Sequence, residues 1–364
     1  MGMYINNTFI PAITIGVNED TLTKKLDLTL STYANSTLTF VPSYAFAYCS
    51  NLSYVNIPNA TSVYASAFFQ CASLTSISFP VATYLGGGAF QGCTHLSSIS
   101  APAVTSLGAG CFSMFSNSNY MLASLTSVNF PVLTIVGAQA FQGCSNLTTV
   151  NAPNLTTISA SAFQGCNKLN SIQTSKVTTV AATAFYYCSS LTTASFPVMN
   201  TGIGAQAFRS CTNLTTAYFP SATNVGSSAF QNCGKLASIT FPNAVSLYTY
   251  AFGYCYSLTT GTFPKVNTVQ AYAFRNCSNL TMLSFSVKVA IAANAFNGCS
   301  NLMSVYLPST TITTLAATTA FAGTPMSNST YTGNFGTIYV PSTLLASYQA
   351  AANWSAYSER FAAI

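Results

Sequence analysis

The chain has 364 residues and a net charge of +6, and only 4% of its residues are charged. Ordinary globular proteins carry roughly 25% charged residues, so the polar surface here must be built mainly from uncharged side chains. The mean hydropathy is +0.40, but the apolar residues are interspersed, and no run of about 18 of them occurs that would span a bilayer. The sequence therefore predicts no transmembrane segment.

Residues 1–37 depart from the pattern that follows them and hold most of the acidic charge. They lack a cationic start followed by an apolar run, so they show no recognisable signal peptide. We expect this segment to cover the first unit of the fold, or to attach the chain to other virion or surface proteins.

Between residues 38 and 321 the sequence repeats one phrase, in which Ala-Phe is followed by Cys and then Leu. The clearest copy is Ala67-Phe68-x-x-Cys71-x-x-Leu74-x-x-Ile77-x-Phe79-Pro80. The phenylalanine returns about every 22 residues, as Phe46, Phe68, Phe90, Phe112, Phe141, Phe163, Phe185, Phe208, Phe230, Phe252, Phe274, Phe296 and a degenerate Phe321. A fixed interval of this kind indicates stacked units that each pack on their neighbours. The sequence predicts a repeat solenoid of about 12 to 13 repeats with one continuous core.

Within each repeat, Leu-x-x-Ile-x-Phe is a short alternating segment that ends at Pro, which predicts one inward-facing strand. The Thr-x-Val and Ala-Phe positions are expected to form the opposite wall of the coil. Stacking one short strand per repeat gives a parallel sheet. One interval is longer, because residues 116–123 carry an insertion, and we expect a surface loop there.

Residues 322–364 are expected to complete the last half-repeat and to form a helical cap. Ser342 follows Pro341, and a serine in this position favours the start of a helix, with Ser342 as its N-cap.

Eleven of the twelve cysteines share one column of the repeat, and the twelfth, Cys111, replaces the Ala before Phe112. Neighbours in such a column lie within the Cα distance of a disulfide, but equivalent side chains point the same way, which is poor geometry for bonding. We interpret the column as buried thiols that act as small core residues. A metal site is not indicated, because no Cys-x-x-Cys occurs and His95 is the only histidine.

These repeats resemble the leucine-rich-repeat superfamily, and the Ala-Phe-x-x-Cys-x-x-Leu-x-x-Ile-x-x-Pro form is similar to its BspA-like branch. The resemblance covers roughly residues 38–341, and the closing segment Ile338-Tyr339-Val340-Pro341 is similar to the way such arrays end. It implies a curved, right-handed solenoid that is used for binding, commonly on microbial surfaces, and that has no catalysis of its own.

The four acidic residues, Glu19, Asp20, Asp27 and Glu359, all lie outside the array, and no carboxylate occurs from residue 41 to 320. Glycoside hydrolysis uses two carboxylates, hydroxyl nucleophiles usually need a basic partner, and Ca²⁺ or Mg²⁺ prefers acidic oxygens. We therefore predict no catalytic residues, no metal, no cofactor and no enzyme activity. We expect His95 to face solvent, and Gly86–Gly88 to serve a turn rather than a phosphate.

All lysines and arginines of the array lie between residues 168 and 288, where tyrosines are also dense. Two readings of the cations stay open, namely sparse solubilising charge, or a weak positive face for an anionic glycan or a membrane surface. They are too few for nucleic acid. Tyrosines among Ser, Thr and Asn bind through rigid rings and adaptable hydrogen bonds. The candidate ligand-binding residues are Tyr186, Tyr187, Arg209, Tyr250, Tyr254, Lys265 and Arg275.

The sequence favours a non-catalytic binding or adhesion protein of a microbial surface or a phage virion, which recognises a host-surface glycan or protein through one face of the solenoid. Its expected location is extracellular, on a cell surface or on a virion. The alternative is a purely structural virion or fibre component of a tail, baseplate or decoration, without a receptor of its own.

Overall fold

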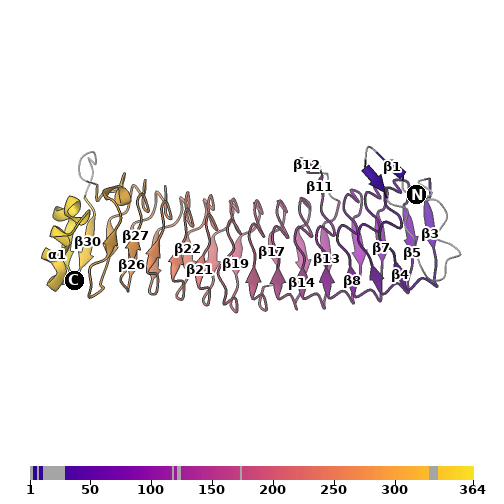
Figure 1. Cartoon of the computed structure of the whole chain (residues 1–364), viewed down its shortest axis with the longest axis horizontal. Helices are drawn as coiled ribbons and strands as arrows, with labels where there is room; N and C mark the ends of the chain where they lie inside the picture. The colour runs from indigo at the N-terminus through magenta and orange to yellow at the C-terminus, as the bar shows by residue number, and fades with distance from the viewer. Residues whose placement is uncertain are drawn as a thin grey trace.

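The protein is an elongated rod of stacked coils in the computed structural model, with its termini at opposite ends (Figure 1). The structure describes residues 3–5, 8–10, 29–116, 119–120, 124–172, 174–327 and 335–364. Two parallel ladders of short strands run along the rod, because each coil contributes one strand to each ladder. Within the described residues, no helix is long and apolar enough to cross a membrane.

The first ladder contains the strand that the sequence predicted in each repeat. In β7 and β9, Ile77 pairs with Ile99 and both point inward, while the serines on either side of each are exposed. Alternation of this kind fixes the register, because a one-residue slip would turn the apolar side chains to solvent. The strands of this ladder are β3 (Thr32–Ala34), β5 (Tyr54–Asn56), β7 (Ser76–Ser78), β9 (Ser98–Ser100), β13 (Ser127–Asn129), β15 (Thr149–Asn151), β17 (Ser171–Ile172), β19 (Thr193–Ser195), β20 (Thr216–Tyr218), β22 (Ser238–Thr240), β24 (Thr260–Phe263), β26 (Met282–Phe285), β28 (Ser304–Tyr306), β30 (Thr337–Val340) and β31 (Phe361–Ala363).

The second ladder consists of two-residue strands at the Thr-x-Val positions, where the sequence predicted a wall but no strand. A segment this short cannot display a period of two, so sequence alternation does not reveal it. Each strand buries its second residue, as Leu85 does in β8. The strands are β4 (Phe40–Val41), β6 (Ser62–Val63), β8 (Tyr84–Leu85), β10 (Ser106–Leu107), β14 (Ile135–Val136), β16 (Thr157–Ile158), β18 (Thr179–Val180), β21 (Asn224–Val225), β23 (Ser246–Leu247), β25 (Thr268–Val269), β27 (Ala290–Ile291) and β29 (Thr314–Leu315).

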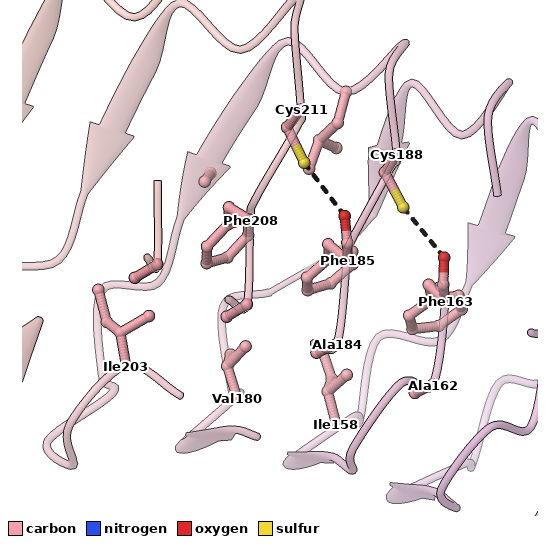
Figure 2. Packing of buried hydrophobic residues seen from close by; sticks show 14 of the residues in the cluster. Ile158, Ala162, Phe163, Val180, Ala184, Phe185, Cys188, Ile203, Phe208 and Cys211 are labelled. Carbon is pink, nitrogen blue, oxygen red and sulfur yellow. Dashed lines mark hydrogen bonds between the residues drawn. The ribbon is translucent and has the colours of Figure 1, made fainter. Parts of the chain in front are cut away.

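A row of stacked phenylalanine rings runs through the core from Phe46 to Phe321, and Figure 2 shows its members Phe163, Phe185 and Phe208. Successive ring centroids lie 5.0 to 5.8 Å apart and the rings are nearly parallel. Offset stacking at this spacing adds to the stabilisation that burial itself provides. The contact between Phe112 and Phe141, at 5.2 Å, spans the insertion, so the core continues past it.

The cysteine column lies beside this row, and all twelve thiols are free and buried. Ten of them donate a hydrogen bond from Sγ to the backbone carbonyl of the phenylalanine in the preceding coil, as Cys188 does to Phe163 at 3.1 Å (Figure 2). The prediction of small buried core thiols is confirmed. The thiols also have a role that was not predicted, because the weak S–H donor of each of these ten cysteines forms a hydrogen bond to the preceding coil.

The C-terminal end is closed by aromatic side chains around the short helix α1 (Leu345–Ala350). Trp354 Nε1 donates to the Thr313 carbonyl at 2.7 Å, and the Tyr348 hydroxyl accepts from the Thr313 amide at 2.8 Å. The cap thus satisfies backbone groups of the last coil that would otherwise be buried without partners. The 3₁₀ segments are η1 (Thr318–Phe321), η2 (Ser342–Leu344) and η3 (Trp354–Arg360).

A C-terminal helix was predicted correctly, but the prediction that Ser342 caps it is wrong. Ser342 lies inside η2, and α1 begins three residues later. Neither helix receives a side-chain cap at its start. Pro341 ends β30, and the chain turns through η2 before the α-helix can form.

Two antiparallel pairs lie outside the ladders. The pair β11 (Phe115–Ser116) and β12 (Asn119–Tyr120) projects from the rod at the insertion (Figure 1). The pair β1 (Met3–Ile5) and β2 (Thr8–Ile10) lies near the N-terminal end. Within the segment 1–37, β3 pairs in parallel with β5 and so belongs to the first ladder. The rest of that segment up to residue 28, and most of the insertion 116–123, lie outside the described residues.

Both ladders are interrupted near the middle of the rod. Within the described residues, the first ladder consists of five sheets, with breaks between β5 and β7, β9 and β13, β17 and β19, and β22 and β24. The second ladder breaks between β18 and β21, where a bridge joins Ile203 to Val225. The two ladders break together between β17–β18 and β19–β21. The repeat from Phe185 to Phe208 contains one residue more than the usual 22. The phenylalanine row still crosses this point, with 5.2 Å between these two rings.

Candidate binding face

Each coil passes from the second ladder to the first through a turn that carries the Ala-Phe pair. The backbone is left-handed at two positions of this turn, two residues before and two residues after the phenylalanine. In the coil of Phe90 these positions are Gly88 and Gly92, with φ of 61° and 76°. Glycine suits them because it has no Cβ to clash in this conformation.

Tyrosine occupies several of these left-handed positions. The six in the described residues, all with φ between 57° and 65°, are Tyr44, Tyr48, Tyr187, Tyr250, Tyr254 and Tyr272. A left-handed residue with a Cβ costs about 1 kcal/mol or more, and bulky residues are rare there. Strain of this kind concentrates at functional sites. The fold therefore presents these rings from the turn at a cost in stability.

The first Tyr-Arg cluster consists of Tyr186, Tyr187 and Arg209, and contains three of the predicted site residues. The Tyr186 and Tyr187 rings are in contact, with centroids 4.3 Å apart. Arg209 Cζ lies 5.7 Å from the centroid of the Tyr186 ring, within the range of a cation–π interaction. Tyr187 is about half exposed.

The second Tyr-Arg cluster consists of Tyr250, Tyr254, Tyr272 and Arg275. The Tyr250 and Tyr272 rings stack at 5.0 Å. Arg275 Cζ lies 5.2 Å from the Tyr272 centroid and 5.9 Å from that of Tyr254. Arg275 Nη1 also donates to the Tyr250 hydroxyl at 3.1 Å. The arginine therefore joins three rings from two neighbouring coils.

The two arginines are held in similar electrostatic surroundings. In each, Nε–H is shielded from solvent and meets no acceptor among the described residues, an arrangement that costs free energy. The hydrogen bond to Tyr250 raises the pKa of Arg275, so its charge is permanent. No carboxylate lies in the array to neutralise either arginine.

The two clusters repeat one arrangement along the rod. In each, a tyrosine two residues after the phenylalanine, Tyr187 or Tyr254, is followed in the next coil by an arginine one residue after the phenylalanine. They are three coils apart, or about 14 Å at the spacing of parallel strands. The turn of the one coil between them, that of Phe230, presents small and amide side chains, namely Ser228, Gln231 and Asn232. We call the surface from Tyr186 to Arg275 along these turns the Tyr-Arg face.

Lys265 does not contact either cluster. It lies in the other connection of the coil, between β24 and β25, where Nζ donates to Asn243 Oδ1 at 2.6 Å. Lys176, in the same connection of its own coil, makes the equivalent bond to Asn154 at 2.6 Å. Lys235 lies in the connection between β21 and β22 and donates to Asn213 Oδ1 at 2.8 Å. These lysines are paired with their neighbours, whereas the two arginines are held against rings.

Sequence reasoning omitted Tyr272 from the candidate site, although it contributes a ring to the second cluster. Asn294 in the next coil donates to its hydroxyl at 3.2 Å. A signal was present, because Tyr272 shares its column with Gly88 and Gly110, which mark a left-handed position. A tyrosine in a glycine column is the pattern that would have identified it.

The other candidates behave as expected. His95 is exposed, and its Nδ1 lies 2.7 Å from the carbonyl of Ala72. The Gly86–Gly88 run lies in the turn, where a Cβ on Gly86 would come within 2.6 Å of the Tyr64 backbone. No group of three His, Cys, Asp or Glu side chains that could hold a metal occurs in the described part of the chain.

Comparison with known proteins identifies the repeats. The description "BspA type Leucine rich repeat region (6 copies)" matches residues 19–120, 113–236 and 223–342. A leucine-rich-repeat protein from Bacteroides ovatus is similar over 94% of both chains, with 22% identity and a TM-score of 0.63. The pneumococcal vaccine antigen PcpA is similar over 92% of this chain and 77% of its own, with 13% identity and a TM-score of 0.50.

No curated protein matches the sequence. The structural similarities, at these identities, establish the fold alone, and the repeat match covers most of the chain. The resemblance drawn from the Ala-Phe-x-x-Cys-x-x-Leu phrase is confirmed. The chain belongs to the BspA-type leucine-rich-repeat proteins.

Proposed function

We propose that this protein is a non-catalytic binding protein of a microbial surface or a phage virion, and that it recognises a host-surface glycan or protein through the Tyr-Arg face. The observation that carries the proposal is the placement of four tyrosines, Tyr187, Tyr250, Tyr254 and Tyr272, in left-handed turns beside two uncompensated arginines. Rings held rigidly on a scaffold lose little entropy on binding.

The family and the composition support this function. BspA-type leucine-rich-repeat proteins are often used in surface adhesion or binding. The absence of carboxylates from residues 41–320 leaves the solenoid without the usual groups for acid–base chemistry. The similar pneumococcal protein is named as a vaccine antigen, which fits a fold exposed to a host.

A cell-binding assay tests the proposal directly. The whole chain would be compared with a triple variant, Tyr250→Ser, Tyr254→Ser and Arg275→Gln, for binding to host cells and to a glycan array. We expect the triple variant to lose binding, because it removes three half-buried polar groups of the second cluster while leaving the phenylalanine row intact.

A matched control removes similar groups outside the Tyr-Arg face. The variant Tyr44→Ser, Tyr48→Ser and Lys176→Gln changes two left-handed tyrosines and one cation in the other connection of the coil, and we expect it to bind as the parent does. Equal binding by the parent and the second-cluster variant would contradict the proposal. If the parent itself bound no cell or glycan and was instead found assembled in purified particles, a purely structural role would replace it.

A further inference from the structure

The Tyr-Arg face places an arginine against tyrosine rings twice, although the rings differ in position, since Tyr186 belongs to the coil before Arg209 and Tyr272 to the coil of Arg275. This duplication constrains the ligand. Each copy pairs an aromatic platform with a guanidinium: Arg209 lies against Tyr186 at 5.7 Å, and Arg275 lies against Tyr272 at 5.2 Å. The copies lie on the same edge of the rod, three coils apart, or about 14 Å. A ligand that used both would need two like groups repeated along one axis.

The charges specify the sign of those groups. Both arginines lack a carboxylate partner, since none occurs in residues 41–320. Within the described residues, the Arg209 guanidinium contacts the Tyr186 ring, and its Nε–H meets no acceptor. Guanidinium groups bind carboxylates or sulfates through two parallel hydrogen bonds. The lysines of the array differ, because Lys176 and Lys235 are already bonded to asparagines.

The side chains between the clusters specify the rest of the ligand. Gln231 and Asn232 lie in the turn between the two clusters, which we call the spacer turn. Asn276 lies beside Arg275 in the second cluster. Amides of this kind both donate to and accept from hydroxyl groups. The spacer turn carries no large aliphatic side chain, whereas the core of a protein interface is usually apolar and aromatic. The combination of flat rings, amides and guanidinium groups suits the C–H faces, hydroxyls and carboxylates of acidic sugars.

We propose that the Tyr-Arg face binds a linear acidic glycan whose chain runs parallel to the rod and places one carboxylate or sulfate at Arg209 and another at Arg275. This inference rests on the proposed function and narrows it to one class of ligand. One sugar unit bound to one cluster is expected to bind weakly. Affinity then comes from one glycan chain that binds both clusters, because binding at the first cluster raises the effective concentration of the chain at the second cluster.

Isothermal titration of the whole chain with linear oligouronides tests the inference. The probes are a disaccharide, an octasaccharide, and the same octasaccharide with its carboxylates reduced to alcohols. We expect the octasaccharide to bind on the order of 100-fold more tightly than the disaccharide, as bivalent contact predicts. Loss of the carboxylates is expected to weaken binding about 10-fold or more, because charge-assisted hydrogen bonds disappear.

Single substitutions distinguish two clusters from diffuse positive charge. Arg209→Gln and Arg275→Gln should each reduce octasaccharide affinity to nearly that of the disaccharide, while changing disaccharide affinity only about twofold, because one cluster remains. Lys176→Gln and Lys265→Gln each remove one positive charge from the other connection of the coil and should leave both affinities nearly unchanged. Circular dichroism of each variant checks that the solenoid is retained.

Three results would overturn the inference: equal affinity for the reduced octasaccharide, no gain with chain length, or lysine variants that weaken binding as much as the arginine variants do. If no oligouronide bound while cell binding still depended on Tyr250, Tyr254 and Arg275, the acidic-glycan inference would fail and the proposed function would stand with a protein as ligand. If cell binding were also unchanged by substitution of these residues, the acidic-glycan inference and the proposed function would both fail.

Discussion

Left-handed tyrosines combine a backbone cost with an exposed ring, so their effects on stability and on binding should separate. Tyr187 has φ of 61°, and glycine occupies the equivalent position in several other coils, including Gly165. In Tyr187→Gly, relief of about 1 kcal/mol of strain offsets the lost ring contacts. We expect the free energy of unfolding to change by less than about 1 kcal/mol, measured by urea denaturation.

Tyr218 provides the comparison, because its exposed fraction, 44%, is close to the 49% of Tyr187, but it lies in β20 with an ordinary strand conformation. Tyr218→Gly relieves no strain and replaces a good strand former with a poor one, so we expect a loss of about 1 to 2 kcal/mol. Equal losses for the two variants would show that the left-handed turn stores no strain.

The buried thiols make stability depend on pH in the alkaline range. Burial raises the pKa of Cys93 and Cys144 to about 12, from an ordinary value of 9.0, because the thiolate is poorly solvated in the core. Below pH 9 both states keep the protons, and the full stability is present. Above it the unfolded chain releases protons that the folded chain retains, so stability falls as pH rises from 9 toward 12.

Each such thiol contributes about 1.4 kcal/mol of destabilisation per pH unit in that window. We therefore expect cooperative unfolding within one or two pH units above 9. Circular dichroism measured as a function of pH checks this. Replacing Cys93 and Cys144 with alanine should make the pH dependence shallower, although stability at pH 7 decreases. A pH profile with the same slope in this variant would contradict the assignment.

At the scale of single elements, the aromatic cap holds the open end of the last coil. Trp354→Phe keeps a buried ring but removes the donor to the Thr313 carbonyl, and a buried acceptor left without a partner costs about 1 to 3 kcal/mol. We expect a loss of this size in thermal or urea denaturation, together with faster amide exchange in residues 313–321.

Tyr348→Phe is the companion variant, because it leaves the Thr313 amide without its acceptor and should cause a loss of the same order. Ser347→Ala changes an exposed residue of α1 and serves as the control. If Trp354→Phe and Tyr348→Phe were as stable as this control, the hydrogen bonds to Thr313 would have no role in the cap.

Sequence patterns predicted those elements whose signal repeats. The Ile77 strand and the Phe row follow from strict columns, and both are present. The second ladder was missed because a pair such as Tyr84–Leu85 is too short to show alternation. The start of α1 was misplaced because Ser342, although a favourable cap residue, continues the turn after Pro341 as a 3₁₀ segment.

The candidate site was predicted in part for a similar reason. Tyr186, Tyr187 and Arg209 are near in sequence or one coil apart, and the repeat period brings them together. Lys265 is also close to Tyr254 along the chain. However, Tyr254 lies in the turn before β24 and Lys265 in the turn after it, so the two residues are on opposite connections of the coil. The left-handed conformation of Tyr272 depends on its position in the turn. Amino-acid composition does not reveal it, and only the glycine residues in the same column of the repeat indicate it.

At the scale of the whole molecule, the interruption of both ladders between residues 172 and 203 divides the rod into two parts. Repeat proteins unfold through nearest-neighbour coupling, so the weakest interface limits cooperativity. We expect amide exchange near Thr193 and Ile203 to be faster than at the equivalent positions Thr149 and Leu107, which lie in strands paired on both sides, and denaturation to show two transitions. A single transition with uniform protection would indicate that the phenylalanine row alone couples the two parts.

The repeated contact between coils also sets the distance between the two Tyr-Arg clusters. Between the clusters, each coil is joined to the next by the same ring stacking and the same bond from a thiol to a carbonyl, so whole repeats can be gained or lost there without changing either cluster. Every added 22-residue unit would lengthen their separation by about 4.8 Å. The array then acts as a molecular ruler, in which the number of intervening repeats selects the charge spacing of the polymer that fits.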